Sequence, residues 1–208
     1  MMEKVTLCIT CYKNDVHFLD ECLGYVKSQT VQPDEILVVA NAIDDDSKLK
    51  QKAKEEGFSL FTTSEPKLPG WGRNTGLFLA KHNIVSFCDV DDVILPRKIE
   101  FIKKVFNDDM DALIHNYHYK IKEDDENFSL YTEEITEIDP TNMNIRTKSM
   151  VPAHHGHMTC RKEILKTHKY REDLVRGEDG TFCQGLVKDS NTKLFFTPLK
   201  LIIYRYRG

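Results

Sequence analysis

Three acidic clusters in the chain have the spacing of an Asp-x-Asp metal site. They are Asp44-Asp45-Asp46, Asp89-Val90-Asp91 and Asp109-Met110-Asp111. Only Asp89-Val90-Asp91 directly follows an apolar run, Ile84–Cys88, whereas the other two resemble solvated caps or loops. Carboxylates at the end of a buried strand repel one another unless a cation neutralises them, and their hard oxygens suit Mg²⁺ or Mn²⁺. We therefore expect a divalent metal at Asp89 and Asp91.

A second acidic pair, Glu178-Asp179, follows Gly177 at the start of a predicted helix. A positioned carboxylate can take the proton from an attacking hydroxyl group. We expect Asp179 in this role, with Glu178 as the second candidate. The alternative is that both acids only cap the helix.

Three histidines, His154, His155 and His157, form the other conspicuous cluster. A zinc site is disfavoured because no cysteine or carboxylate stands at matching ligand spacing. We expect His155 and His157 on the acceptor side of a site, as hydrogen-bonding groups or in a supplementary metal contact. Simple loop packing is the alternative.

Strand and helix patterns alternate in the first half of the chain. The apolar runs that predict strands are Val5–Cys11, Glu35–Ala40, Phe58–Thr62 and Ile84–Cys88. The helical patterns between them start at Asn14 or Asp15, at Ser47 and at Gly72. Nearly continuous apolar strands separated by helices indicate an α/β fold with a single, mostly parallel, Rossmann-like sheet flanked by helices.

The second half is less regular. The predicted helices are Pro96–Phe106, Arg161–Thr167 and Asp179–Lys188, and the predicted strands are Ala112–Tyr119, Leu194–Phe196 and Leu199–Tyr204. The acid-rich stretch Lys122–Asp139 predicts a solvated hairpin or loop. Because the chain has no repeat and no low-complexity linker, we expect residues 1–208 to form a single domain.

Polar groups stand where the predicted parallel strands end. Ligands of an open parallel sheet bind beyond the carboxyl ends of its strands. Thr10 and Tyr12 end the first strand, and Asn41 ends the second. Asp89 ends the fourth, and Arg73 lies in the helix before it. These groups suit a nucleotide diphosphate and its metal, so we expect the binding site at this edge of the sheet.

Bulk composition excludes several classes of protein. The net charge of −4 and the pI near 6.1 do not favour nucleic acid as a partner. No apolar run approaches the roughly 20 residues that cross a bilayer, and the first residues lack a signal-peptide pattern. The six cysteines are scattered through apolar segments, Cys8 and Cys11 included. We expect buried free thiols in a reducing compartment, the cytoplasm.

The order of these motifs resembles the glycosyltransferase family 2 domain, which has the GT-A fold. The similar segments are Ile9–Asn14 (ITCYKN), Asp34–Val39 (DEILVV), Pro69–Ala80 (PGWGRNTGLFLA), Val85–Pro96 (VSFCDVDDVILP), Gly156–Arg161 (GHMTCR), Arg176–Asp179 (RGED) and Tyr204–Arg207 (YRYR). Together they span nearly the whole chain.

The resemblance implies a metal-dependent, inverting hexosyltransferase that moves a sugar from a nucleotide-sugar to a hydroxyl of a carbohydrate or glycan acceptor. UDP-glucose is the default donor, and Mn²⁺ or Mg²⁺ is the cofactor. The residues implied in nucleotide-sugar binding are Thr10, Tyr12, Asn41, Trp71, Arg73, Asp89, Val90 and Arg205. By the same resemblance, residues 1–95 form the nucleotide-sugar half, and residues 96–208 form the acceptor and catalytic-base half.

Individual roles follow from the same likeness. A uracil base stacks near Tyr12 and meets Asn41 and Arg73. Asp89 reaches the ribose or the metal, and Asp91 binds the metal directly. Arg205 or Arg207 assists the leaving group, and Trp71 lies in a mobile loop that covers the sugar. The alternatives are a basic tail for the arginines and a core plug for the tryptophan.

Three departures from the family pattern limit these expectations. The family has Asp-Asp-Gly-Ser after the second strand, where this chain has Ala40–Ile43 (ANAI), so Asn41 takes the place of the base-binding acid. Arg207 replaces a final His, and no Gln-x-x-Arg-Trp motif follows Gln184, which predicts a non-processive enzyme. Typical members are longer, so this domain could belong to a longer protein.

Two other functions stay open. A sugar nucleotidyltransferase would need a Gly-rich phosphate loop after the first strand, which Cys11–Asn14 does not supply. A degenerate domain that binds nucleotide-sugar without transfer is conceivable because of Asn41. The retained acids Asp89, Asp91 and Asp179 argue against it.

Overall fold

The structure, a computed structural model, describes residues 3–119, 144–145 and 158–205. Its strands are β1 (Val5–Tyr12), β2 (Glu35–Asn41), β3 (Ser59–Thr63), β4 (Ile84–Asp89), β5 (Val93–Ile94), β6 (Ala112–Tyr119), β7 (Asn144–Ile145), β8 (Met158–Arg161) and β9 (Leu194–Tyr204). Its α-helices are α1 (Leu19–Lys27), α2 (Ser47–Glu56), α3 (Pro69–Leu79), α4 (Lys98–Val105) and α6 (Glu178–Lys188). Two 3₁₀ helices, η1 (Lys13–Phe18) and η4 (Lys162–Lys166), follow β1 and β8.

All of these strands join one sheet in the order β3-β2-β1-β4-β8-β6-β9-β5, with β7 paired to β9. The pairs β3–β2, β2–β1 and β1–β4 are parallel, as expected for apolar runs separated by helices. β8 runs antiparallel to both β4 and β6, and β6 pairs in parallel with β9. The predicted single α/β sheet flanked by helices is therefore confirmed, with its antiparallel part in the second half of the chain.

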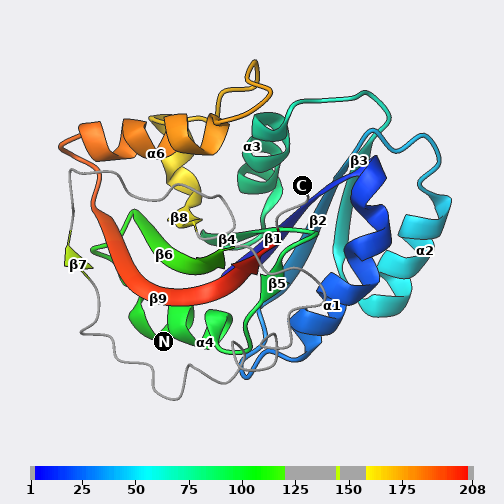
Figure 1. The fold of residues 1–208 in the computed structure, drawn as a ribbon, viewed down its shortest axis with the longest axis horizontal. Helices are drawn as coiled ribbons and strands as arrows, with labels where there is room; N and C mark the ends of the chain where they lie inside the picture. The colour runs from blue at the N-terminus through cyan, green and yellow to red at the C-terminus, as the bar shows by residue number, and fades with distance from the viewer. Residues whose placement is uncertain (1–2, 120–143, 146–157, 206–208) are drawn as a thin grey trace.

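The sheet lies between α3 and α6 on one side and α1 and α4 on the other (Figure 1). A hydrophobic core fills the space on each side. Alternate residues of β1 show the division, because Val5, Leu7 and Ile9 pack with α1 and α4, whereas Cys8 packs with α3 and α6. Each face of the parallel strands is thus covered by helices. This burial on both faces explains why the strands read as continuous apolar runs.

Two glycines fix the position of the first helices. Gly57 ends α2 in the left-handed conformation with φ of 77°, which a residue without Cβ adopts at little cost. Gly76 lets α3 approach β1 closely, since a Cβ at this position would lie 2.3 Å from Cys8 Sγ. Pro69 occupies the first turn of α3, where a missing N–H costs nothing.

The second half differs in detail from the sequence-based expectation. In place of the predicted helix Arg161–Thr167, Arg161 ends the short strand β8 and the 3₁₀ helix η4 follows over Lys162–Lys166. The two predicted closing strands form one strand, β9, in which an irregularity opposite His115 and Asn116 accommodates Pro198. The acidic stretch Lys122–Asp139 lies outside the described residues.

All six cysteines are buried and free, as predicted. Within the described ranges, no helix is long and apolar enough to cross a membrane.

Candidate active site

The carboxyl ends of β1, β2 and β4 bring four predicted site residues together. Register pairs Thr10 of β1 with Asp89 of β4, and Tyr12 of β1 with Asn41 of β2. The Thr10 hydroxyl donates a hydrogen bond of 2.8 Å to Asp89 Oδ1. Asp89 is therefore oriented by its neighbouring strand before any ligand binds.

Arg73 of α3 links this edge of the sheet to α6. Its side chain is 7% exposed, and its guanidinium donates to Glu178 Oε1 while Nη2 lies 3.9 Å from Asp89 Oδ2. Two carboxylates on different elements thus share one buried cation. This arrangement neutralises Arg73 within the protein and joins the two acidic motifs of the sequence.

Glu178 and Asp179 have different surroundings although they are adjacent. Gly177, with φ of 78°, turns the chain into α6, so Glu178 is buried against Arg73 while Asp179 stays half-buried. Asp179 Oδ1 accepts a 2.7 Å hydrogen bond from the Gly180 N–H. Glu178 is thereby engaged in a buried ion pair with Arg73, and its role as second candidate base stays a prediction.

Asn41 is also held within the protein. Its Nδ2 donates to the Lys67 carbonyl at 2.6 Å, and its Oδ1 accepts from the Lys67 N–H at 2.9 Å. The side chain is buried, with 7% of the residue exposed. Asn41 therefore fixes the loop between β3 and α3, a contact that the sequence did not predict, and its part in base recognition stays a prediction.

Val90 and Trp71 differ from their expected surroundings. The Val90 N–H donates to the Thr10 carbonyl at 3.0 Å and its side chain is buried, so Val90 joins the strand-end turn to β1. Trp71 lies in the first turn of α3 rather than in a loop. Its ring faces Phe61 of β3 at a centroid distance of 6.1 Å. The ring lines a groove of about 420 Å³ on the side of α3 together with residues such as Phe78.

The backbone N–H of Arg205 contacts the strand-end turn. Its N–H donates to Asp92 Oδ1 at 3.3 Å, whereas its guanidinium binds Glu21 and stacks over Phe18. The contact of this guanidinium with the leaving group stays a prediction. Arg207, together with His154, His155 and His157, lies outside the described residues.

Sequence reasoning missed a buried charged group below the site. Lys98 is fully buried, and its Nζ donates to the Phe87 carbonyl at 2.8 Å. Burial lowers the pKa of the Lys98 ammonium to about 8, while Cys88 and Asp92 oppose this shift. A signal was present, since Lys98 lies on the same helical face as the buried Ile102 and Val105.

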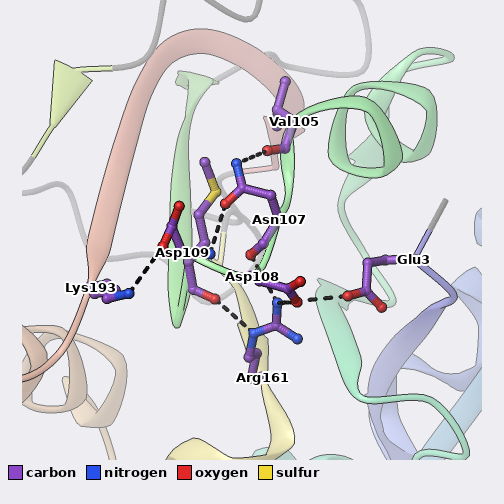
Figure 2. Close-up of polar contacts among 8 residues, drawn as sticks. Glu3, Val105, Asn107, Asp108, Asp109, Arg161 and Lys193 are labelled. Carbon is purple, nitrogen blue, oxygen red and sulfur yellow. Dashed lines mark hydrogen bonds and ion pairs between the residues drawn. The ribbon is translucent and has the colours of Figure 1, made fainter. Parts of the chain in front are cut away.

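The two other acidic triplets have structural roles, as the sequence indicated. Asp46 accepts from the Thr62 hydroxyl and pairs with Lys50 at the start of α2. Asp109 pairs with Lys193 at 3.2 Å, at the amino end of β6 (Figure 2). β6 runs parallel to β4, and Asp109 precedes β6 whereas Asp89 ends β4. The Asp109-Met110-Asp111 triplet therefore lies at the edge of the sheet opposite Asp89.

The carboxylates at the end of β4 fit a hard divalent cation. Asp89 is 27% exposed at its side chain, and Asp91, two residues later, is half-buried. No group of three His, Cys, Asp or Glu side chains able to hold a metal occurs within the described ranges. A Mg²⁺ or Mn²⁺ ion here would therefore take two protein carboxylates at most and complete its shell with water and phosphate oxygens.

Comparison with known proteins identifies the family and the fold of this chain. The sequence model of the family described as "Glycosyl transferase family 2" matches residues 6–169, which contain β1 to β8. The chain belongs to glycosyltransferase family 2. Curated relatives include glycosyltransferase MJ1057 of Methanocaldococcus jannaschii, named as uncharacterized, which is 24% identical over 188 residues, or 86% of this chain and 62% of the relative. GlyG of Streptococcus pneumoniae is 27% identical over 135 residues, 63% of this chain and 44% of GlyG.

Solved structures show the same fold for this family 2 domain. The structure of S. aureus TarS 1-349 in complex with UDP-GlcNAc superposes with a TM-score of 0.70 at 18% identity. It covers 99% of this chain and 59% of the TarS chain. The predicted GT-A fold is therefore confirmed. The chain spans less than two thirds of the length of these relatives.

Proposed function

We propose that this family 2 domain is a metal-dependent, inverting and non-processive glycosyltransferase. It would transfer a hexose from a nucleotide-sugar, with UDP-sugars favoured, to a hydroxyl group of a carbohydrate acceptor. The observation that carries the proposal is the bridge from Asp89 through Arg73 to Glu178, because it sets the first turn of α6 beside the strand-end carboxylates.

The proposed chemistry divides between the two ends of this bridge. Asp179, next to Glu178 but not tied to Arg73, would accept the proton of the acceptor hydroxyl as its oxygen attacks the anomeric carbon. Asp91 and Asp89 would hold the divalent ion, which when bound offsets the charge that develops on the departing nucleotide diphosphate. Arg73, whose Nη2 lies 3.9 Å from Asp89 Oδ2, would attract this carboxylate and hold it toward the same end of the sheet.

The preference for uridine has two supports. Tyr12 places a half-buried aromatic side chain beside Asn41 at the carboxyl end of β1. TarS, which shares the fold, has been solved in complexes with UDP-GlcNAc and UDP. UDP-glucose and UDP-GlcNAc are therefore the first two donors to compare. The acceptor would enter from the side of α6, where Asp179 lies.

The proposal is tested by ligand-dependent thermal stability and by sugar release. UDP with Mn²⁺ should raise the melting temperature of the wild-type protein, and a panel of UDP-, GDP- and dTDP-sugars should rank the donors. Asp91→Asn should weaken metal-dependent UDP binding by about 10-fold or more. The matched control is Asp109→Asn, from the triplet at the opposite edge, which should bind as the wild type does.

Each outcome has a definite meaning. Metal-dependent binding together with slow hydrolysis of one donor supports a transferase. Binding without turnover of any donor in the panel favours the degenerate nucleotide-sugar-binding domain instead. Equal loss of binding in Asp91→Asn and Asp109→Asn would contradict the assignment of the strand-end carboxylates as metal ligands.

A further inference from the structure

Lys98 stands out among the described charged side chains because it is completely buried. It begins α4 directly below the end of β4, and its Nζ donates to the carbonyl oxygen of Phe87, two residues before Asp89. A buried ammonium group is costly unless nearby groups stabilise its charge. Packing alone therefore does not explain a lysine at this position.

Acidic and polarizable groups surround this ammonium group. Cys88, Asp92, Cys22 and Asp89 all act on Lys98 in the direction that favours its charged form. Asp92 is itself buried, with 1% of the residue exposed. Its Oδ1 accepts the N–H of Arg205 at 3.3 Å, whereas its Oδ2 has no hydrogen-bond partner among the described residues. The buried ammonium group of Lys98 thus lies next to the acidic turn at the end of β4.

We propose that Lys98 is a positioning residue for the strand-end turn that carries Asp89 and Asp91. Its ammonium group fixes the Phe87 carbonyl, two residues before Asp89, and offsets the negative charge of the Asp89 carboxylate. The two half-buried carboxylates of Asp89 and Asp91 can then lie close together before a cation binds. This inference rests on the proposed function, because it assigns Asp89 and Asp91 to the metal and the diphosphate.

A role of Lys98 in positioning the turn can be distinguished from a purely structural role in the core. If the ammonium acts on the turn, its loss should loosen residues 87–92 and weaken metal-dependent binding, while β2 and β3 stay as ordered as before. If Lys98 only supports the core, its loss should destabilise both cores and all parallel strands alike. Hydrogen exchange resolves these cases peptide by peptide.

The experiment compares Lys98→Met with Lys104→Met, which removes an exposed lysine from the same helix. Affinity for UDP with Mn²⁺ is measured by calorimetry, and amide exchange is measured without ligand. Lys98→Met should weaken binding of the metal and nucleotide about 10- to 100-fold, as loss of a group that orients a metal ligand does. It should also speed exchange in a peptide covering residues 84–94 but not in one covering residues 35–41. Lys104→Met should change neither.

Lys98→Gln covers the case in which the methionine variant fails to fold, because its amide keeps a donor for the Phe87 carbonyl without the charge. Unchanged binding and exchange in a folded Lys98 variant would overturn the inference, and so would faster exchange spread evenly over β2 and β4. If the wild-type protein binds no nucleotide with either metal, the proposed function fails. The exchange of residues 84–94 then still decides whether Lys98 orders the turn.

Discussion

Arg73 and Glu178 form a buried ion pair that joins α3 to the first turn of α6 across 105 residues of sequence. The pair also holds Asp89 near the same guanidinium, at 3.9 Å. It therefore connects the half of the domain that carries the strand-end carboxylates to the half that carries Asp179. Several measurable consequences depend on this link.

Glu178→Gln should lower the free energy of unfolding by about 1.5–3 kcal/mol, the cost of losing a hydrogen bond to a charged group. The effect stays within this range because Asp89 remains as a second partner of Arg73. Urea denaturation measures the change, and Glu163→Gln, on an exposed side chain of η4, is the matched control. If Glu178→Gln abolished transfer without any loss of stability, Glu178 would be the base after all.

Asp179→Asn should have the opposite profile. The amide oxygen can still accept the Gly180 N–H, so the free energy of unfolding should change little. Loss of a general base should reduce transfer by about 100- to 10,000-fold. Affinity for the metal and UDP, measured by calorimetry, should be retained. Substantial transfer by Asp179→Asn would contradict its assignment as the base.

Gly76→Ala tests the close packing of α3 on β1. The added methyl group would lie 2.3 Å from Cys8 Sγ and 3.5 Å from the Phe87 ring. We expect a loss of about 1–3 kcal/mol from overpacking. The control is Gly24→Ala in α1, where the methyl group meets nothing within 4 Å. That variant should gain about 0.5–1 kcal/mol from the better helix former. Equal effects at the two positions would contradict this account of the packing.

Alkaline pH should destabilise the domain through its buried thiols. Burial raises the pKa of Cys8 and Cys160 well above the ordinary thiol value, and it raises the pKa of Cys11 and Cys183 to about 12. Because the folded state keeps these protons, their stabilisation is complete below pH 9.0, where unfolded thiols ionise, and is lost as the pH rises toward about 12. The pKa of Lys98 is lowered to about 8, so between about pH 8 and pH 10.5 this residue makes the free energy of unfolding rise with pH. It is one group against the four thiols.

Cys183→Ala isolates one of these thiols. Above pH 9.0 the slope of unfolding free energy against pH should become shallower by about 1.4 kcal/mol per pH unit. Denaturation titrations with a reductant present measure the slope without thiol oxidation. A slope identical to that of the wild type would show that Cys183 ionises equally in both states.

The pattern of apolar runs determined much of this protein by itself. Runs such as Glu35–Ala40 and Ile84–Cys88 predict strands buried on both faces, and such strands require a parallel sheet with helices on each side. The placement of polar residues at strand ends follows from the same pattern. Asp89 could therefore be separated from Asp109 by sequence context alone, and Figure 2 locates Asp109 among structural ion pairs.

Only the tertiary structure decided which polar groups remain available to a ligand. Glu178 and Asp179 are equivalent in sequence, but one helical position turns Glu178 toward Arg73 and leaves Asp179 half-buried. Asn41 meets Lys67, and Arg205 meets Glu21, over long stretches of chain. These partners cannot be read from local patterns, because whether a side chain is satisfied depends on groups that folding brings within hydrogen-bond distance. Local sequence determines where a strand ends, whereas the folded chain determines which of its terminal groups are left to act.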